Sequence, residues 1–349
     1  MIRWEVLAWA GYFILGYFVL LQTYMLFLVF HSAVVLRRSH HLARFNRSFD
    51  TLSSRRTPPV SIVIPAHNEA AGIVDSVKSM SIVAYPKVEI VVTNDGSIDD
   101  TLQLLIDAFG LERVRIPYRP DIATKPIRGI YRTNSPVQIT VIDKENGGRA
   151  DALNAGINVA RYPYALCTDA DVILDARCLV AGMKRVIEDR ERTIGVGGNV
   201  RPLNGSRVEL GHLVKSGVPK EYVPRIQIIE YLRTFVASRP AWSAMGALPL
   251  VSGAFGIWKR SAVIAIGGFA AGHLGEDMDL TVRMHRHHIE QQIPYRIVYE
   301  PRAVIWTEVP SDRRVLRGQR IRWHRGLMQV VADNMGIVLN PHYGTLGTV

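Results

Sequence analysis

The sequence predicts an α/β fold, a mixed and mostly parallel sheet flanked by helices, behind an N-terminal transmembrane helix. Three observations support this prediction: a long uncharged stretch at the N-terminus, short apolar runs that alternate with helical patterns, and polar residues after the apolar runs. With 349 residues, the chain can bury a sizeable core in one large domain or two smaller ones.

The N-terminal stretch from Val6 to Val35 contains no Lys, Arg, Asp or Glu, and it exceeds the roughly 20 residues that span a bilayer. A signal peptide is the alternative, but the apolar region is too long for one, and Arg3 is followed by Glu5. Four arginines follow in RRSHHLARFNR. By the positive-inside rule, we expect a helix in the plasma membrane (1–36), a basic juxtamembrane linker (37–57) and a cytoplasmic domain (58–310).

The formal net charge is +11. This charge suits an anionic membrane surface or a phosphorylated ligand, and by itself it leaves nucleic acid open as a partner. Cys167 and Cys178 are the only cysteines, and their spacing is not that of metal ligands. We expect both to be free thiols in a reducing compartment.

Short β-branched runs and helical patterns alternate after Pro59. The runs VSIVIPA, VEIVVTNDGS, VQITVID and YALCTDADV predict buried strands, and AAGIVDSVKSM, DDTLQLLIDAF and GRADALNAGINVA predict the helices between them. This order implies parallel strands joined by right-handed crossovers. The stretch from Arg115 to Ser135 is rich in Arg and Pro without a clear period, so we expect a surface loop there.

Polar side chains follow three of the predicted strands, at the edge where such sheets bind ligands. They are Asn68 and Glu69, Asn94 and Asp95, and Asp169 and Asp171. Taken singly, Asp95 could make a turn and Asp171 could cap a helix that begins near Asp175. Their coincidence at one edge favours a binding site.

The pair Asp169 and Asp171 suggests a metal site. Two carboxylates separated by one residue at a strand end can hold a divalent cation and leave positions free for water and a diphosphate. The metal would then neutralise a diphosphate leaving group. On its own, the D-x-D pattern is a weak signal, because it occurs by chance in many chains.

Seven segments appear in a characteristic order: VSIVIPAHNEA, VVTNDGSIDDT, KENGGRADALNAG, TDADV, VSGAFGIWKR, GEDMDL and QRIRW. In this set, the chain resembles the inverting family 2 glycosyltransferases. It is most similar to their membrane-bound processive branch, which includes cellulose, chitin, hyaluronan and poly-N-acetylglucosamine synthases. The resemblance covers roughly Val60 to Gly326, and it implies a GT-A fold, Rossmann-like and able to bind a nucleotide-sugar.

The resemblance also implies roles on the donor side. Asp95 matches the acid that contacts the uridine, and Ala66 and Glu69 line the same pocket. Asp169 and Asp171 match the acids that contact UDP and its Mg²⁺ or Mn²⁺. Arg149 stands where many relatives have Lys in the nucleotide-binding loop, and a guanidinium keeps the charge but is not equivalent to an ammonium.

On the acceptor side, the resemblance implies that Asp277, next to Glu276, is the general base. It implies that Gln319, Arg322 and Trp323 touch the diphosphate and the acceptor sugar, and that Ser252 and Gly253 border the acceptor. From the residues alone, Glu276 and Asp277 could instead cap the following helix. Arg322 and Trp323 could likewise belong to an Arg-rich amphipathic helix on the membrane, and both readings of that helix can hold together.

Two further segments are predicted to lie at the membrane interface. The stretch 206–250 contains YVPRIQIIEYLRTFVA, which places Ile226, Ile229, Leu232 and Val236 near one helical face, although an ordinary core helix is the alternative. The stretch 311–349 contains the Q-x-x-R-W helix, and we expect it to be truncated before further transmembrane helices. For the cluster His285, His287 and His288, a solvated basic helix face is favoured over a metal site.

The leading functional hypothesis is metal-dependent, inverting transfer of a hexosyl or N-acetylhexosaminyl group from a UDP-sugar to a growing β-linked polysaccharide. The alternatives are transfer of one sugar to a lipid acceptor and a non-catalytic, membrane-anchored nucleotide-binding or scaffold protein. The expected partners are a UDP-sugar, an oligosaccharide or lipid acceptor, and membrane lipids. A partner membrane subunit is allowed by this scheme, and no nucleic acid is expected.

Overall fold

The computed structural model describes residues 4–45, 57–133, 137–209 and 211–348. In these ranges, one sheet of ten strands forms the centre of the domain. In spatial order, its strands are β3 (Glu112–Val114), β4 (Ile127–Arg132), β5 (Gln138–Lys144), β2 (Val88–Asp95), β1 (Val60–Ala66), β6 (Tyr164–Cys167), β11 (Gly256–Lys259), β8 (Thr193–Pro202), β12 (Arg296–Thr307) and β7 (Ile173–Leu174).

The central strands β5, β2, β1 and β6 run parallel, as the alternation of apolar runs and helices predicted. Their side chains are almost entirely buried, because helices pack on the sheet: α2 (Ile73–Ser81), α3 (Thr101–Phe109), α4 (Arg149–Val159) and α5 (Cys178–Glu188). Helix α4 approaches β1 so closely that a Cβ on Gly156 would lie 2.4 Å from a methyl of Val63. Only glycine fits at that position.

The prediction of a surface loop at 115–135 is wrong for the second half of that range, where β4 pairs antiparallel with both β3 and β5. The arginines that led to the prediction of a loop have hydrogen-bond partners on β5. The Arg128 guanidinium donates to Asp143 Oδ1 at 2.9 Å, and Arg132 Nε donates to Thr140 Oγ1 at 3.2 Å. Cross-strand polar pairs of this kind stabilise a strand near the sheet edge without an apolar pattern.

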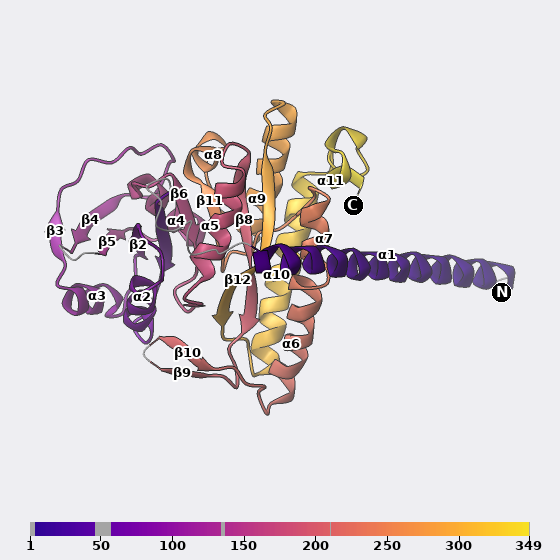
Figure 1. Cartoon of the computed structure of the whole chain (residues 1–349), viewed down its shortest axis with the longest axis horizontal. Helices are drawn as coiled ribbons and strands as arrows, with labels where there is room; N and C mark the ends of the chain where they lie inside the picture. The colour runs from indigo at the N-terminus through magenta and orange to yellow at the C-terminus, as the bar shows by residue number, and fades with distance from the viewer. Residues whose placement is uncertain (1–3, 46–56, 134–136, 210, 349) are drawn as a thin grey trace.

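Helix α1 (Trp4–Phe45) leaves the domain as one long rod (Figure 1). It continues into the range predicted as a juxtamembrane linker, because 37–45 contains no Gly or Pro and several good helix formers. Its Trp4–Ser39 part is the one helix of the described ranges that is long and apolar enough to cross a membrane. At 1.5 Å per residue, its 42 residues extend about 63 Å, roughly twice the hydrocarbon thickness of a bilayer.

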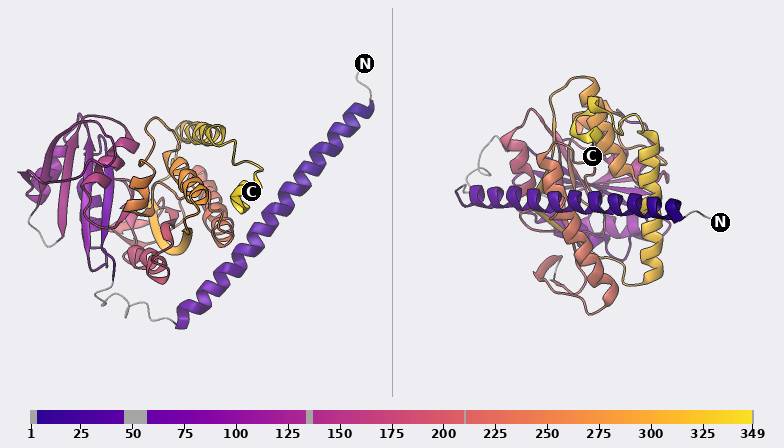
Figure 2. Two further views of the ribbon diagram at one scale, coloured as in Figure 1. Left: turned by 90° about the horizontal axis from the view of Figure 1, so that it is seen from above. Right: turned by 90° about the vertical axis from the view of Figure 1, so that its right-hand side faces the viewer.

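The helices α6 (Tyr222–Phe235), α7 (Arg239–Ala244) and α10 (Arg313–Asp333) lie on the side of the domain next to α1 (Figure 2). Ile226, Ile229 and Leu232 on α6 are exposed. An ordinary core helix would bury this stripe, so that alternative is wrong. The remaining elements are β9 (Arg207–Glu209), β10 (His212–Lys215), α8 (Arg260–Ala265), α9 (Glu276–Glu290), a 3-10 turn at Pro341–Tyr343 and α11 (Thr345–Thr348).

The prediction of a solvated histidine face is wrong for two of its three members, because His285 and His288 are buried. His285 Nε2 donates to the Leu248 carbonyl at 2.9 Å, which leaves Nδ1 to accept from Tyr295 Oη at 2.7 Å. Burial lowers the pKa of His285 to about 4, so the ring is neutral. Cys167 and Cys178 are free, as expected, and both are buried.

Candidate active site

The carboxyl ends of β1, β2 and β6 meet at one edge of the sheet. Ala66 pairs with Asn94 in the β1–β2 ladder, and the Thr168 amide donates to the Val63 carbonyl at 3.1 Å. Asp95 therefore ends β2 close to the point where Asp169 follows β6. The prediction that parallel strands bring these acids to one edge is confirmed by this register.

Asp95 is buried and both of its carboxylate oxygens accept hydrogen bonds from the protein. Lys144 Nζ and the Gly147 amide donate to Oδ1 at 2.6 and 3.0 Å, and the Gly148 amide donates to Oδ2 at 2.7 Å. Lys144 is fully buried and also pairs with Asp151 at 2.5 Å. Asp95 thus holds the glycine turn before α4, and its contact with a uridine stays a prediction.

Sequence reasoning missed Lys144. The available signal was a lysine directly after the apolar run VQITVID, where a charged side chain must be paired if the strand end is buried.

Arg149, the first residue of α4, joins three segments that are far apart in the sequence. Its Nε and Nη2 donate to Asp169 Oδ1 at 2.9 and 2.6 Å, its Nη1 donates to Glu276 at 2.5 Å, and Nη2 also donates to the Gly253 carbonyl at 2.9 Å. Burial alone would lower the pKa of Arg149, but Asp169 and Glu276 outweigh it and raise that pKa. The guanidinium therefore stays charged.

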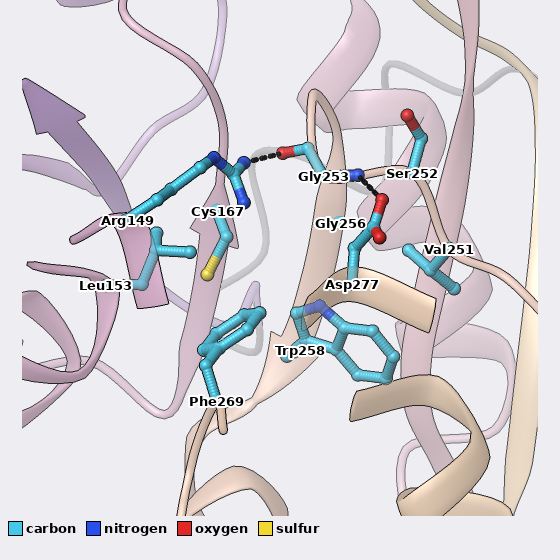
Figure 3. Close-up of a pocket in the computed structure, with 10 residues that line it drawn as sticks. All are labelled: Arg149, Leu153, Cys167, Val251, Ser252, Gly253, Gly256, Trp258, Phe269 and Asp277. Atoms are coloured by element: carbon cyan, nitrogen blue, oxygen red, sulfur yellow. Dashed lines mark hydrogen bonds between the residues drawn. The ribbon is translucent and has the colours of Figure 1, made fainter. Parts of the chain in front are cut away.

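Asp277 lies beside this ion-pair network, at the start of α9. Its Oδ2 accepts from the Gly253 amide at 2.9 Å, and its Oδ1 accepts from the Met278 amide at 2.8 Å. Figure 3 shows Asp277 and Arg149 on opposite sides of Gly253, over a small pocket floored by Cys167, Trp258 and Phe269. Each carboxylate oxygen keeps a free lone pair for a further hydrogen bond.

Glu276, the neighbour of Asp277, is partly buried and forms an ion pair with Arg149. Burial raises the pKa of Glu276, the Arg149 guanidinium lowers it, and Asp277 raises it again. Since its side chain is 15% exposed and paired with Arg149, Glu276 orients the arginine and leaves Asp277 as the freer carboxylate.

The D-x-D acids form part of a larger acidic cluster. Burial raises the pKa of Glu69, and Asp171 and Asp169 raise it further. The pKa of Asp171 is raised by loss of hydration and by Asp169. The described residues contain no set of three or more His, Cys, Asp and Glu side chains arranged around one metal position. An oxygen-only pair of acids suits Mg²⁺ or Mn²⁺, which take their other ligands from phosphates and water.

The Q-x-x-R-W residues lie on α10, which crosses the start of α9. Gly326 packs backbone to backbone on Gly275, where a Cβ would lie 2.8 Å from the Gly275 nitrogen. Gln319, Arg322 and Trp323 precede Gly326 by seven, four and three residues, which places them on the α9 side of the helix. Arg322 and Trp323 are exposed, and the Gln319 Oε1 atom is buried with no hydrogen-bond partner in the described part of the chain.

The predicted site residues therefore fall into two groups. The structure brings Arg149, Asp169, Gly253, Glu276 and Asp277 into one bonded network. Ser252 lines the same pocket. Glu69 and Asp171 lie within electrostatic range of Asp169, whereas the Q-x-x-R-W side chains share no described hydrogen bond with the network.

Comparison with known proteins agrees with this geometry. A family model described as "Glycosyltransferase like family 2" matches residues 58–326, so the chain belongs to this family of glycosyltransferases. It is 29% identical over 291 residues to the poly-beta-1,6-N-acetyl-D-glucosamine synthase of Staphylococcus epidermidis, covering 82% of this chain and 59% of that protein. It is also 29% identical over 273 residues to the synthase of the same name from Staphylococcus aureus strain COL, covering 78% and 55%.

The chain thus spans less than two thirds of the length of these curated relatives. Among solved structures, it is similar to the mannosyltransferase PcManGT from Pyrobaculum calidifontis, determined in complex with GDP-Man and Mn²⁺. The TM-score is 0.60 at 20% identity, covering 91% of this chain and 79% of the other. This similarity confirms the predicted GT-A fold.

Proposed function

We propose that this glycosyltransferase transfers a sugar from a UDP-sugar, with inversion, to a growing β-linked polysaccharide at the cytoplasmic face of the membrane. One observation carries the proposal: Arg149 bonds both the D-x-D acid Asp169 and Glu276, the neighbour of Asp277, and so links the strand-end acids to the start of α9. Donor-side and acceptor-side chemistry would then be separated by a single side chain.

Asp277 would act as the general base. As the acceptor oxygen attacks the anomeric carbon, its proton passes to the Asp277 carboxylate, and the bond to the nucleoside diphosphate breaks on the opposite face of the sugar. The amides of Gly253 and Met278 hold the carboxylate in place and leave lone pairs for the acceptor hydroxyl. Ser252 and Gly253 would border that hydroxyl.

The donor would lie along the strand ends, with the uridine near Ala66, Glu69 and Asp95. Asp169 and Asp171 would hold Mg²⁺ or Mn²⁺, which when bound supplies Lewis-acid neutralisation of the diphosphate. Arg149 adds a fixed positive charge on the same side. Gln319, Arg322 and Trp323 would reach the diphosphate and the acceptor sugar from α10, where a guanidinium suits phosphate and an indole suits a sugar ring.

The membrane placement rests on charge and apolar exposure. Arg37 and Arg38 follow the apolar part of α1, and apolar side chains of α6 and α10 are exposed. This arrangement favours a cytoplasmic domain resting on the inner surface of the plasma membrane, in contact with its lipids and with any partner membrane subunit.

Transfer of one sugar to a lipid acceptor is the second candidate, and a second cavity favours it. The cavity lies between α6 and the ends of β8 and β12, with exposed Val218 and Leu232 at its mouth and buried Trp306 inside. Tyr231, also in its lining, lies within electrostatic range of Asp171. An amphipathic acceptor suits an apolar mouth next to the membrane.

The proposal is tested by UDP release from membranes that contain the full chain, with a panel of UDP-sugars and with Mn²⁺, Mg²⁺ or a chelator. We expect turnover with one sugar, lost on chelation and in Asp277→Asn, which should still bind UDP. Asp171→Ala should weaken metal-dependent UDP binding itself. A ladder of products supports polysaccharide synthesis, one glycolipid supports the second candidate, and UDP binding without turnover under any metal supports a non-catalytic role.

A further inference from the structure

One narrow stripe of α1 packs on the domain, against α7. Tyr24, Leu28 and Ser32 are spaced four residues apart and therefore lie on one side of the helix. Leu28 and Ser32 are each 1% exposed, in a helix whose apolar part is otherwise open. The left view of Figure 2 shows α1 passing beside the domain.

Ser32 completes the N-terminus of α7 from outside that helix. Its Oγ donates to the Ala237 carbonyl at 3.0 Å and accepts from the Ala241 amide at 3.1 Å. Ala241 is the third residue of α7, and its amide is one that an N-cap side chain normally satisfies. The α7 N-cap residue, Ser238, makes no such bond and donates to Arg233 instead.

A second hydrogen bond fixes the rotation of the contact. Trp242 Nε1 donates to Tyr24 Oη at 2.8 Å. With Leu28 buried between the two polar contacts, α1 holds both ends of the first turn of α7. The contact begins about 20 residues after the N-terminus of the apolar stretch, where α1 would leave the hydrocarbon layer, so a Trp–Tyr pair suits its depth.

The segment 247–253, which we call the strap, continues from α7 to the reaction site. The Ala247 amide donates to the Trp242 carbonyl at 2.9 Å, so the strap starts from the end of α7. It then runs along one face of α9, and three hydrogen bonds join them. His285 Nε2 donates to the Leu248 carbonyl at 2.9 Å, the Val251 amide donates to Thr281 Oγ1 at 3.1 Å, and the Gly253 amide donates to Asp277 Oδ2 at 2.9 Å.

The three α9 residues are again spaced four apart, and the last of the three bonds ends on the carboxylate of Asp277. A shift of α7 therefore moves the strap, and the strap moves the amide that orients Asp277. The carbonyl of the same residue, Gly253, accepts a hydrogen bond from Arg149 Nη2. Because Asp169 and Glu276 also hold that guanidinium, a shift of Gly253 acts mainly on the base.

We propose that Ser32 is a positioning residue for Asp277, which makes the membrane helix part of the reaction site's framework rather than a tether. The inference rests on the proposed function, in which Asp277 is the base. Removing the Ser32 hydroxyl unpins α7, loosens the strap and misplaces the carboxylate, while the strand-end donor site stays intact.

The test compares Ser32→Ala with Ser32→Thr and Thr23→Val in the full chain, held in lipid nanodiscs. Thr23 lies on the same helix and its hydroxyl donates only within α1, to Val19, so it is the matched control. We expect Ser32→Ala to lower kcat about tenfold, since small misplacements of reacting groups are costly. The KM for the UDP-sugar should stay within about twofold, because the donor site is untouched.

Amide hydrogen exchange supplies the second readout. In Ser32→Ala, exchange at Ala241 and along the strap should quicken about fivefold, the typical effect of losing a cap. Ser32→Thr keeps the hydroxyl and should restore both readouts, and Thr23→Val should change neither.

Faster exchange with an unchanged kcat would overturn the proposal and leave Ser32 a stabilising residue only. An equal loss of kcat in Thr23→Val, or no change in exchange at the strap, would overturn it as well. If the unaltered protein releases no UDP with any sugar, the proposed function fails, and the exchange comparison still decides whether Ser32 holds the strap.

Discussion

Replacing Gly326 with alanine should separate α10 from the start of α9 and lower transfer activity. The added Cβ would lie 2.8 Å from the Gly275 nitrogen and 2.9 Å from the Leu274 carbonyl carbon. Both are backbone atoms that cannot rotate away. An ordinary contact begins at 3.4 Å, so the two segments must part by about 0.6 Å.

That movement carries the Q-x-x-R-W residues with it, because they share a rigid helix with Gly326. If a misplacement of about 1 Å costs about a hundredfold in rate, 0.6 Å should lower kcat roughly ten- to twentyfold. The overpacking itself should lower the free energy of unfolding by about 1–3 kcal/mol. UDP affinity should fall less than kcat, because the D-x-D acids lie on other elements and only the contacts from α10 are displaced.

UDP release and UDP binding measured side by side check this prediction, with Gly318→Ala as the control. Gly318 lies on the same helix with nothing within 4 Å of an added Cβ. Alanine there should leave kcat unchanged and stabilise the helix by about 1 kcal/mol. Normal turnover in Gly326→Ala, or an equal loss in Gly318→Ala, would refute the idea that the Gly275–Gly326 contact sets the position of α10.

Three further predictions concern buried charge. Because His285 is neutral with a pKa of about 4 when folded, and the unfolded ring has a pKa of about 6.5, its contribution is complete above pH 6.5 and is lost as the pH falls toward 4. The free energy of unfolding should drop by about 2 kcal/mol between pH 7 and 5 in denaturant titrations, and His285→Gln should remove that slope. Lys144→Met should lower the free energy of unfolding by about 3–5 kcal/mol in the same titrations, because Asp95 and Asp151 would be buried without their cation. A small loss of stability would contradict the paired geometry. Arg149→Lys should keep UDP binding but lower kcat about tenfold in UDP-release assays, since one ammonium cannot reproduce the guanidinium's bonds to Asp169, Glu276 and Gly253; full activity would show that only its charge matters.

The parallel part of the sheet could be predicted from the sequence because burial on both faces leaves continuous β-branched runs. Runs such as VSIVIPA and VEIVVTND end in the polar residues that mark the sheet edge. The strand β4 could not be predicted, because its arginines are satisfied by side chains of β5 rather than by an apolar face. The burial of His285 and His288 on α9 could not be predicted for a similar reason: their hydrogen-bond partners are the Leu248 and Met284 carbonyls and Tyr295.

The candidate site divides in the same way. The identity of its acids follows from motifs. The hydrogen bonds that hold the site together are those of Arg149, and they reach residues 20, 104 and 127 positions away. No periodicity encodes such pairs. The contact between Ser32 and Ala241 spans 209 positions and lies between the apolar helix α1 and a helix of six residues, so it too needed the folded chain.

The charge of the site runs against the charge of the protein. The chain carries a net +11, yet Asp169, Asp171, Glu276 and Asp277 lie within electrostatic range of Arg149, and Glu69 lies within range of Asp169 and Asp171. Besides burial, Asp171 and Asp169 raise the pKa of Glu69, and Asp169 raises the pKa of Asp171. A diphosphate alone would therefore meet repulsion where the motifs place it, whereas a divalent cation would relieve the acids and attract the phosphates together. The excess of carboxylate over guanidinium is thus a physical reason to expect that nucleotide binding requires the metal, and that the wider basic surface serves the membrane and the approach of the donor.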